Sequence, residues 1–501
     1  MNADSPGMRP DMRPDMRPDM RPGTIPNMMI DADELTRRAD GHWLTPPGGL
    51  SVTAVEIDSR LCAPGTLFAA LAGQHADGHD YLAAAAANGA AAALVARDPG
   101  PMPCPLLMVD DVEAALARLG AFGRAAHRMA GGHLVAITGS VGKTGSKEML
   151  AHMLRRLGGC HANRASFNNH LGVPLTLATL PATPLPAIQE IGMNAAGEIS
   201  TLSTLAQPDI AVITRIADSH AGFFDSLDDI AAAKAEIFDG LTAGGTAILN
   251  ADDPYFTFLG ERARHAGAGR IIGFGTDSNA DARLLDVVAD SAGTHIRADI
   301  LGVRMDVRMG TRGQHWARNA MGMLASVAAL DLDIAEAAEK LNDFSELPGR
   351  GAVTEGVFNG ATITLVDDSY NAGPASMNAA FATIAERPPQ IMVLSDMLEL
   401  GDAGAVAHAA LAPAIAALHP RVLITIGPMM AEMASSLPAS ITRHAVDAPD
   451  AAIDALRAML RDGDLVFIKG SNGSGACRVA AEILDGFSTP GGAKGGASHA
   501  A

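Results

Sequence analysis

Residues 133–158 read HLVAITGSVGKTGSKEMLAHMLRRLG, and this stretch decides the fold of the middle of the chain. The apolar run HLVAIT predicts a buried strand, a loop with glycines follows it, and KEMLAHMLRRLG predicts a helix. Gly139 and Gly142 allow the backbone to approach a phosphate group, Lys143 supplies a positive charge, and the Thr144 hydroxyl can bind Mg²⁺. Strand, loop and helix in this order favour a phosphate-binding loop.

The loop departs from the common spacing G-x-x-x-x-G-K-[ST], because Ile137 stands where the first glycine is usual. The alternative is a turn of glycine and serine that only connects a strand to a helix. The contiguous Gly-Lys-Thr directly after a strand favours the nucleotide site. We therefore expect the phosphates of a nucleotide to be held by Gly139, Ser140, Val141, Gly142, Lys143 and Thr144.

The composition is that of a globular protein with a sizeable core. The chain has 501 residues, of which 48% are hydrophobic and 19% charged, and at about 150 residues per domain this predicts about three domains. A formal charge of −19 argues against nucleic acid as a partner. The four cysteines have no C-x-x-C spacing, which indicates buried thiols in a reducing compartment. No signal peptide or membrane span is recognisable, so we expect a cytoplasmic protein.

The chain divides into three folded blocks between two tails. Residues 1–29 contain a repeat of Met-Arg-Pro-Asp and are expected to be disordered, as is the low-complexity tail 487–501. Residues 30–131, 132–345 and 346–486 each mix apolar strands with helical segments, which predicts an α/β fold class with mostly parallel sheets. Two such blocks in series place ligand sites at the carboxyl ends of strands.

Three further residues follow strands of the central block or lie on its helices. Glu190 ends the predicted strand AIQEIGMN, His220 follows AVITRIADSH, and Lys234 lies in the helical segment DIAAAKAEIF. Each has a structural alternative: a paired core carboxylate, a loop histidine with its bonds satisfied, and a solvated lysine beside Glu236. Together with the phosphate loop, however, they form an ordered set that could hold Mg²⁺ and a nucleotide.

The ordered set resembles the Mur ligases, the ATP-dependent amide-forming enzymes of peptidoglycan synthesis. The matching segments are IDSR, PGTLFAAL and DGHDY in the first block; ITGSVGKT, NNHLGVPLTL, GEI, AKAEIFDGL and LNADDP in the second; and LPGR, DDSYNAGPASM, DMLELG and KGS around the third. DDSYNAGPASM is similar to the members that add D-alanyl-D-alanine, and the DNPR motif of the members that add diaminopimelate or lysine is absent.

The resemblance implies a role for each matching residue. Lys143 and Thr144 would handle the phosphates of ATP and one Mg²⁺, Glu190 would be a further metal ligand, and His220 would help to hold a second Mg²⁺. Lys234 would be carbamoylated and face that metal as an anion. The remaining sites implied are uridine diphosphate at Ser59 and Arg60, the substrate cleft at Asn168 and Asn169, adenine and ribose at Asn250 and Asn319, the γ-phosphate at Arg350, and ATP with the incoming dipeptide at Asp368, Tyr370, Asn371, Lys469 and Ser471.

The implied fold has a small N-terminal domain for the UDP end of the substrate, a central P-loop domain and a C-terminal Rossmann-like domain. The implied reaction joins D-Ala-D-Ala to the terminal carboxylate of UDP-N-acetylmuramoyl-tripeptide through an acyl phosphate, giving the pentapeptide, ADP and phosphate. ATP and Mg²⁺ would be required. We expect a monomer with transient contacts to other cell-wall enzymes.

Some positions depart from the family pattern. Gly145 follows Gly-Lys-Thr where Thr or Ser is usual, which we expect to loosen the start of the helix. Gly373 and Ser395 replace Asn and Gly near the expected dipeptide site. Other interpretations remain: another ATP-dependent acid–amine ligase, such as a folylpolyglutamate synthase or a different Mur ligase, a scaffold that lost its activity, or a P-loop NTPase switch. IDSR and PGTLFAAL disfavour the folate enzyme, and the substrate-domain motifs disfavour the NTPase switch. The intact Lys143, Glu190, His220 and Lys234 disfavour a scaffold.

Overall fold

The structure is a computed structural model that describes residues 30–488, except 74–75, 165, 218–223, 225, 291–292, 312, 346, 399 and 472. The predicted metal ligand His220, the Met-Arg-Pro-Asp repeat and the end of the C-terminal tail lie outside the described residues. The chain forms two compact units. The first ends at Gly131 and also contains Pro174–Pro184, and the second comprises Gly132–Val173 and the chain from Leu185.

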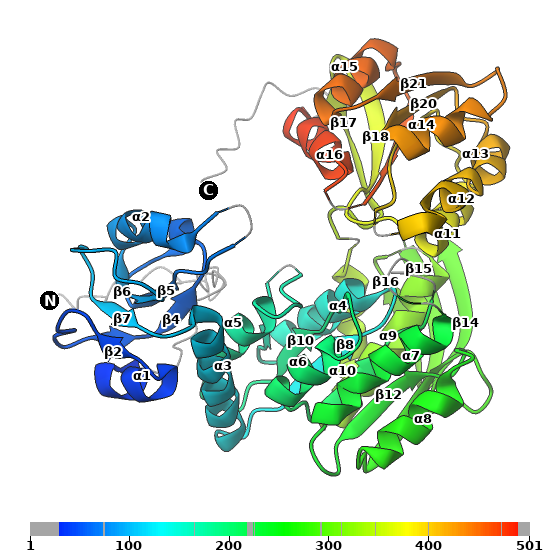
Figure 1. The fold of residues 1–501 in the computed structure, drawn as a ribbon. Helices are drawn as coiled ribbons and strands as arrows, with labels where there is room; N and C mark the ends of the chain where they lie inside the picture. The colour runs from blue at the N-terminus through cyan, green and yellow to red at the C-terminus, as the bar shows by residue number, and fades with distance from the viewer. Residues whose placement is uncertain are drawn as a thin grey trace, which may run out of the picture. The chain divides into compact units, whose positions relative to one another are not determined.

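The first unit is built on a sheet of five strands in the order β2-β7-β6-β5-β4 (Figure 1). Strands β4 to β7 are parallel to their neighbours and β2 is antiparallel to β7, while β1 and β3 pair separately. The strands are β1 (Ile30–Asp31), β2 (His42–Trp43), β3 (Ser51–Val52), β4 (Ala54–Glu56), β5 (Thr66–Ala69), β6 (Ala90–Val95) and β7 (Leu106–Met108). The helices are α1 (Ala32–Ala39), α2 (Leu82–Ala87) and α3 (Val112–Met129), with short 3₁₀ turns η1 (Ser59–Leu61) and η2 (Gly78–Tyr81).

The alanine-rich run LAAAAANGAAAALVA is a helix, a turn and a strand, as the sequence predicts. Helix α2 ends before Asn88, Gly89 takes a positive φ of 102°, and strand β6 begins at Ala90. The Cβ that another residue would carry at position 89 would lie 3.1 Å from Pro64, so glycine suits both the conformation and the space.

The second unit contains a sheet of nine strands in the order β16-β15-β14-β13-β12-β11-β8-β10-β9. Its parallel part is formed by β8 (Leu134–Thr138), β9 (His161–Ala162), β10 (Ala187–Glu190), β11 (Ile210–Ile213), β12 (Thr246–Asn250) and β13 (Arg270–Gly275), with β14 (Ala282–Asp290) parallel to β13. Strand β8 lies between β10 and β11. The chain therefore leaves β8 where the strand order reverses, which is where open parallel sheets bind ligands.

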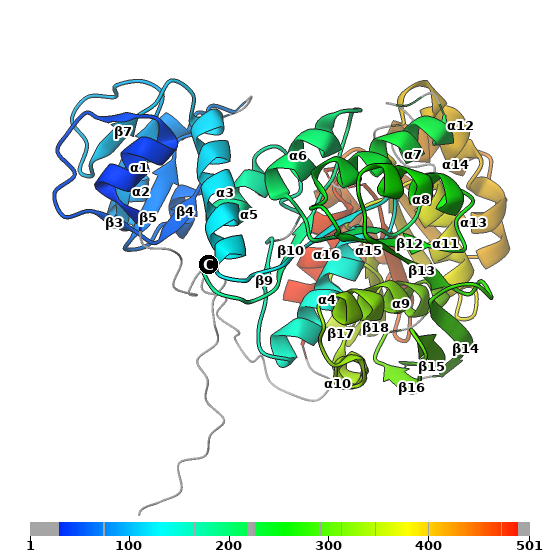
Figure 2. The same cartoon turned by 90° about the horizontal axis from the view of Figure 1, so that it is seen from below.

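Helices cover both faces of this sheet (Figures 1 and 2). They are α4 (Lys143–Arg156), α6 (Glu198–Ala206), α7 (Leu227–Ala235), α8 (Phe256–His265), α9 (Gln314–Ala329) and α10 (Ile334–Glu339), with 3₁₀ turns η3 (Glu236–Gly240) and η4 (Lys340–Asp343). Helix α5 (Gly172–Ala178) belongs from Pro174 onward to the first unit, where it packs against α3. One core joins α4 and α9 to the sheet, with Val135, Ile137 and Met149 among its fully buried members. The predicted helix from Lys147 begins four residues earlier, at Lys143.

Two antiparallel strands, β15 (Gly293–Ile300) and β16 (Val303–Met309), extend the nine-stranded sheet beyond β14. The chain then crosses to a sheet of six strands in the order β17-β18-β22-β19-β20-β21. Its strands are β17 (Ala352–Phe358), β18 (Ala361–Asp368), β19 (Ile391–Ser395), β20 (Val422–Ile426), β21 (Thr442–Val446) and β22 (Leu465–Lys469). All neighbours in it are parallel except β17 and β18. The strand candidates ATITLVDD, QIMVLSD, RVLITIG and DLVFIKG are thereby confirmed.

The six-stranded sheet has an apolar core on each face. One core contains Met377, Ile415 and Met430, and the other contains Ile453 and Val479, so helices flank the sheet on both sides. The helices are α11 (Pro374–Ile384), α12 (Gly404–Ala409), α13 (Ala412–Leu418), α14 (Pro428–Ser435), α15 (Pro449–Met459) and α16 (Ala476–Asp485), with the 3₁₀ turn η5 (Gly401–Ala403). This doubly wound arrangement confirms the predicted α/β fold class.

No helix in the described ranges is long and apolar enough to cross a membrane. The four cysteines are free thiols; Cys62, Cys104 and Cys160 are buried, and Cys477 is half-buried. Burial raises the pKa of Cys62 and of Cys160 to about 11. Cys62, Cys104 and Cys160 are thus the buried thiols that the sequence predicts, whereas Cys477 is more exposed than predicted.

Candidate active site

The phosphate loop follows strand β8 and leads into helix α4. Gly139 and Gly142 take positive φ angles of 144° and 86°, which favour glycine. A Cβ at residue 139 would lie 2.1 Å from Thr214 Oγ1, so no side chain fits there. Ile137, which stands where the common pattern has its first glycine, is a fully buried residue of β8. The short spacing is therefore compatible with a complete loop.

Thr214, which follows β11, supports the loop from behind. Its Oγ1 donates to Val141 O at 2.6 Å, and the backbone of Ser140 donates to Arg215 O at 2.8 Å. Asn250 in turn donates from Nδ2 to Thr214 O at 3.0 Å and accepts from the backbone of Asp252. The structure thus places the predicted adenine residue Asn250 in a buried position where it supports the loop.

Lys143 is at the first position of α4 and is half-buried. Its Nζ donates to Gly139 O at 2.6 Å, so the ammonium group already faces the loop that would surround the phosphates. Burial lowers its pKa and Arg350 lowers it further, while Glu190 raises it. A polyphosphate would offset that burial cost with its own negative charge.

Thr144 and Glu190 form the centre of the candidate metal site. Thr144 Oγ1 donates to Glu190 Oε2 at 2.7 Å, and Asn168 Nδ2 donates to Glu190 Oε1 at 2.7 Å. Glu190 is 1% exposed and ends strand β10, as predicted. A hydroxyl and a carboxylate side by side are hard oxygen donors of the kind Mg²⁺ prefers, so these residues fit a magnesium ion.

Lys234, on helix α7, is fully buried. The alternative of a solvated lysine is therefore wrong. Its Nζ has no hydrogen-bond partner among the residues that the structure describes. Burial lowers its pKa well below the usual value, and Lys143 lowers it further, against the opposing effect of Glu190. A fully buried amine without a described hydrogen-bond partner, near a cation and a carboxylate, is chemically unusual and points to a modified lysine or a ligand.

The metal site cannot be completed from the described residues alone. Among them there is no group of three or more His, Cys, Asp or Glu side chains arranged to hold a metal ion. The segment that contains His220 lies outside them. Thr144 and Glu190 are therefore brought together by the structure, and Lys234 lies near enough to Glu190 for that carboxylate to raise its pKa.

Gly145 has a packing role that the sequence does not reveal. A Cβ at this buried position would lie 2.8 Å from Cη2 of Trp316, a residue of helix α9 that is 4% exposed. Helix α4 begins at Lys143 and runs through Gly145, and the indole ring fills the space beside this residue; a loosening effect of Gly145 on the helix stays a prediction. Asn319, which is also on helix α9, lies beside Gly142. Its side-chain amide is 3.1 Å from the position that a Cβ at residue 142 would take.

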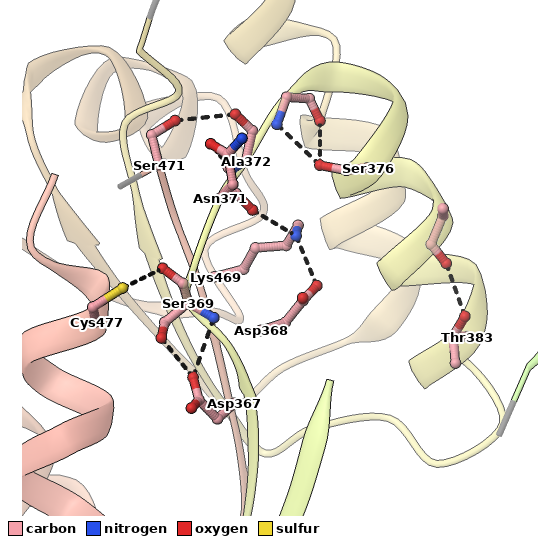
Figure 3. Close-up of polar contacts among 12 residues, drawn as sticks. Asp367, Asp368, Ser369, Asn371, Ala372, Ser376, Thr383, Lys469, Ser471 and Cys477 are labelled. Atoms are coloured by element: carbon pink, nitrogen blue, oxygen red, sulfur yellow. Dashed lines mark hydrogen bonds and ion pairs between the residues drawn. The ribbon is translucent and has the colours of Figure 1, made fainter. Parts of the chain in front are cut away.

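A second polar cluster lies at the carboxyl ends of strands β18 and β22 (Figure 3). Lys469 Nζ donates to Asp368 Oδ2 at 2.7 Å and to Asn371 O at 3.0 Å. Burial raises the pKa of Asp368, although Lys469 and Arg350 lower it. The structure thus brings together three of the residues predicted for ATP and the dipeptide.

Arg350 and Tyr370 contact each other in the same part of the chain. The guanidinium carbon of Arg350 is 4.2 Å from the centre of the Tyr370 ring, which is a cation–π contact. Gly349 fits closely against Tyr370, whose backbone donates to Gly349 O at 2.9 Å. The Tyr370 hydroxyl is hydrogen-bonded to that of Ser166. Tyr370 therefore orients Arg350, in addition to any contact with substrate.

Ser471 and Ser395 make local hydrogen bonds, whereas the third residue, Gly373, has no structural explanation. Ser471 Oγ donates to Ala372 O at 3.0 Å and accepts from the backbone of Leu398 at 2.9 Å. Ser395 is fully buried, and its hydroxyl is 2.5 Å from that of Ser474. Gly373 has an extended φ of −152°, and nothing lies within 4 Å of where its Cβ would be. No steric constraint of the described residues requires glycine there.

Two predicted substrate residues have bonds within the fold. Asn169 Oδ1 accepts from the backbone of Leu171 and of Gly172, where helix α5 begins. Asn168, by contrast, bonds Glu190 directly and lies against Gly192. Asn168 is thus part of the candidate metal site, whereas Asn169 shapes the turn that precedes α5.

In the first unit, Ser59 and Arg60 follow strand β4. Ser59 is buried, its carbonyl accepting from Asn88 Nδ2 at 3.0 Å, and Arg60 is exposed and paired with Asp58 at 2.6 Å. A pocket of about 200 Å³ lies among residues that follow β5, β6 and β7, including Asp110. Parallel strands carry ligand sites at this end.

Three residues that pack or bond next to the candidate site were not singled out from the sequence. They are Thr214, Trp316 and Lys147. Lys147 had a usable signal, because it is one helical turn after Lys143 and Thr144 and falls on the same face of α4. Thr214 and Trp316 had none, since their roles depend on contacts between segments far apart in the chain.

Comparison with known proteins agrees with this geometry. Residues 51–119 match the Mur ligase family catalytic domain, 137–327 the Mur ligase middle domain, and 349–472 the Mur ligase glutamate ligase domain. The UDP-N-acetylmuramoyl-tripeptide–D-alanyl-D-alanine ligase of Mycobacterium tuberculosis is 32% identical over 475 residues, which cover 86% of this chain and 92% of that protein. The enzyme of the same name from Escherichia coli is 32% identical over 430 residues, covering 84% and 91%.

Solved structures give the same result. A crystal structure of MurF from Acinetobacter baumannii aligns with a TM-score of 0.78 at 28% identity, covering 92% of this chain and all of that one. MurF from Thermotoga maritima, solved in complex with ADP, aligns with a TM-score of 0.70 at 24% identity and supports the fold alone. The matched domains, the relatives that align over most of their length and the loop with Thr144 and Glu190 lead to one assignment: the chain belongs to the Mur ligase family.

Proposed function

We propose that this protein joins D-alanyl-D-alanine to the terminal carboxylate of UDP-N-acetylmuramoyl-tripeptide, using ATP, and so completes a peptidoglycan precursor. The observation that carries the proposal is the contact of Thr144 Oγ1 with Glu190 Oε2 at 2.7 Å beside the ammonium group of Lys143. The relatives aligned over most of the chain are named for this reaction. The products are UDP-N-acetylmuramoyl-pentapeptide, ADP and phosphate.

A carboxylate must first be activated, because its negative charge makes it a poor acceptor for an amine. The tripeptide carboxylate attacks the γ-phosphorus of ATP, the bond from this phosphorus to the β,γ-bridging oxygen breaks, and an acyl phosphate and ADP result. Lys143, Arg350 and the backbone N–H groups of the phosphate loop bind the triphosphate and reduce the repulsion between the two anions. Thr144 and Glu190 would hold Mg²⁺, which when bound supplies positive charge to the phosphate oxygens.

The amine of D-alanyl-D-alanine then attacks the acyl carbon. A tetrahedral intermediate forms, phosphate leaves, the nitrogen gives up its proton, and an amide bond remains. Asp368, Asn371, Lys469 and Ser471 lie together at the carboxyl ends of β18 and β22 and are proposed to orient the dipeptide. Since acyl phosphates hydrolyse readily, these residues must also exclude water.

Lys234 is proposed to react with CO₂ when neutral. Its amine bonds to the carbon of CO₂ and loses one proton, which gives a carbamate anion. The fully buried Nζ without a described partner and its lowered pKa support this proposal. The anion would be balanced by Lys143 and by a metal held with His220, which is proposed as a ligand from sequence alone.

The substrate domain is assigned by the same reasoning. Residues 30–131 are proposed to bind the UDP end of the substrate at Ser59 and Arg60, residues 132–345 to bind ATP, with Asn319 near the base or ribose, and residues 346–486 to receive the dipeptide. The position of Ser59 and Arg60 in the 3₁₀ turn η1, which follows the parallel strand β4, supports the first of these.

The decisive experiment measures phosphate release from ATP by the purified protein. We expect release only when UDP-N-acetylmuramoyl-tripeptide and D-alanyl-D-alanine are both present, with the pentapeptide identified by mass spectrometry. Glutamate or a single D-alanine replaces the dipeptide as the matched control. Equal turnover with either control would refute the assignment of the dipeptide, and release without any peptide substrate would refute the ligase itself.

A further inference from the structure

Lys147 is a buried cation for which the proposed reaction has no use. It is on helix α4, fully buried, and its Nζ is 3.0 Å from Asn163 O and 2.7 Å from Glu148 Oε1. An ammonium group in the interior is costly unless polar partners surround it. Because Nζ bonds a backbone oxygen beyond its own helix, Lys147 fixes the position of another segment.

That segment is Asn163, which directly follows strand β9. Its backbone N donates to Ile188 O at 3.2 Å, and its side-chain Oδ1 accepts from the backbone of Glu190 at 2.9 Å. Asn163 is 2% exposed, so these bonds are shielded from competing water. Asn163 therefore connects Lys147 to the end of strand β10, where Glu190 stands.

The chain of contacts from Lys147 through Asn163 leads back to helix α4. Glu190 Oε2 accepts from Thr144 Oγ1 at 2.7 Å, and Thr144 is three residues before Lys147 in the first turn of α4. The contacts form a closed ring of four residues: Lys147, Asn163, Glu190 and Thr144. A shift of β10 away from the phosphate loop would break at least one bond of this ring.

We propose that Lys147 is a positioning residue that holds the Glu190 carboxylate at the distance from Thr144 at which both can serve one Mg²⁺–nucleotide complex. Lys147 acts through Asn163 and touches no phosphate, since its ammonium group is fully buried and bonded to Asn163 O. The inference rests on the proposed function. Residues behind metal ligands typically change metal affinity or activity about 10- to 100-fold when replaced.

The test measures ADP binding by calorimetry across a series of Mg²⁺ concentrations. In Lys147→Met we expect Mg²⁺-dependent ADP binding to weaken about 10-fold or more, with binding of ADP without Mg²⁺ changed less than about 2-fold. Lys147→Arg, which can still donate to Asn163 O, should recover part of the loss. Glu148→Gln is the matched control, because it removes the ion pair but leaves the bond to Asn163, and it should bind like the wild type.

Asn163→Ala is the second variant. It removes the acceptor for the Glu190 backbone but keeps the backbone oxygen that Lys147 bonds, and we expect the same selective loss of Mg²⁺-dependent binding. If circular dichroism shows that Lys147→Met does not fold, the Mg²⁺ dependence of ADP binding in Asn163→Ala and Lys147→Arg tests the proposal instead.

The two hypotheses fail in different ways. A wild-type protein that binds ADP equally with and without Mg²⁺ would refute the proposed metal site and this inference with it. A wild type with strong Mg²⁺ dependence, and Lys147 and Asn163 variants with the same dependence, would refute this inference alone. An equal loss with and without Mg²⁺ would assign Lys147 a general structural role and also overturn the inference.

Discussion

The indole ring of Trp316 fills the space that a side chain at residue 145 would need, with Cη2 2.8 Å from the ideal Cβ position of Gly145. The two residues are far apart in sequence, on helices α9 and α4. Trp316 also contacts Phe344 edge to face, with ring centres 5.6 Å apart. The start of the helix that follows the phosphate loop is therefore held from behind by an aromatic core.

Gly145→Thr should destabilise the protein by about 1–3 kcal/mol, because the new side chain would overlap the indole ring in a well-packed core. Urea unfolding followed by circular dichroism gives the free energy of unfolding. Trp316→Ala should by itself cost about 3–5 kcal/mol through the cavity it leaves. In that background Gly145→Thr should cost less than in the wild type. A full additive cost in the double variant would contradict the packing explanation.

The sequence predicts the parallel strands well, and for a physical reason. Apolar runs such as residues 134–138 and 391–395 are fully buried strands, and burial on both faces leaves a continuous hydrophobic signal. Lys143, Thr144 and Glu190 were also predicted, because each follows or ends a strand. The positions of these three residues relative to the apolar runs can be recognised in the sequence itself.

The sequence does not predict contacts made between distant segments. The fully buried state of Lys234 depends on the segments packed around α7. The sequence of this helix is equally compatible with a lysine exposed to solvent. Gly145 was interpreted as a helix defect because its partner Trp316 is far along the chain. The bond of the Asn250 amide to Thr214 O behind the loop was not predicted either, and a contact of Asn250 with the nucleotide stays a prediction. In each case tertiary packing, and no local pattern, determines the role.

Removing the cation of the Asp368–Lys469 pair should destabilise the protein more at pH 7 than at pH 5. Lys469 lowers the pKa of Asp368 against the effect of burial, so Lys469→Met should raise that pKa further. A carboxyl group with a higher pKa in the folded than in the unfolded chain binds more protons when folded. The free energy of unfolding then falls as pH rises through that interval. We expect a loss of about 3 kcal/mol at pH 7 from urea unfolding.

The matched control for this pair is the double variant Asp368→Asn/Lys469→Met. It leaves no buried charge without a partner, so its stability should recover relative to Lys469→Met and show little difference between pH 5 and pH 7. Ligase activity should stay low in both variants, because the proposal places both side chains at the dipeptide site. Recovery of activity together with stability would assign the pair a structural role alone.

Tyr370→Leu should lower kcat/KM for ATP by a few-fold to about 30-fold, the equivalent of the 0.5–2 kcal/mol that a cation–π contact contributes. The reason is that Arg350 lies 4.2 Å from the ring centre and would lose its support. Tyr370→Phe keeps the ring and should retain most of the activity. If the Phe variant is as impaired as the Leu variant, the hydroxyl is the functional group and the stacking argument is wrong.

The four cysteines should differ in reactivity toward a thiol reagent. Burial raises the pKa of Cys62 and Cys160 to about 11 and also raises that of Cys104, so few thiolates form at pH 8. Cys477 is half-buried, with Sγ donating to Ser369 O at 2.9 Å, and should be labelled first. Peptide mapping after timed alkylation measures this order. All four should react at similar rates in denaturant, and early labelling of Cys160 in native protein would contradict the fold.

Lys234→Ala should reduce ligase turnover by about 100-fold or more, as expected when a group that stabilises developing charge is removed. Because Lys234 is one of the largest fully buried side chains, its truncation leaves a cavity, so the folded fraction is measured by circular dichroism before turnover is compared. Excess chloride or bicarbonate should restore part of the activity by supplying an anion where the carbamate would stand. Wild-type protein exposed to ¹³C-labelled CO₂ should show a carbamate carbon resonance that Lys234→Ala lacks. Wild-type turnover in Lys234→Ala would refute the carbamate proposal. Low turnover without anion rescue and without the resonance would limit Lys234 to a role as an amine.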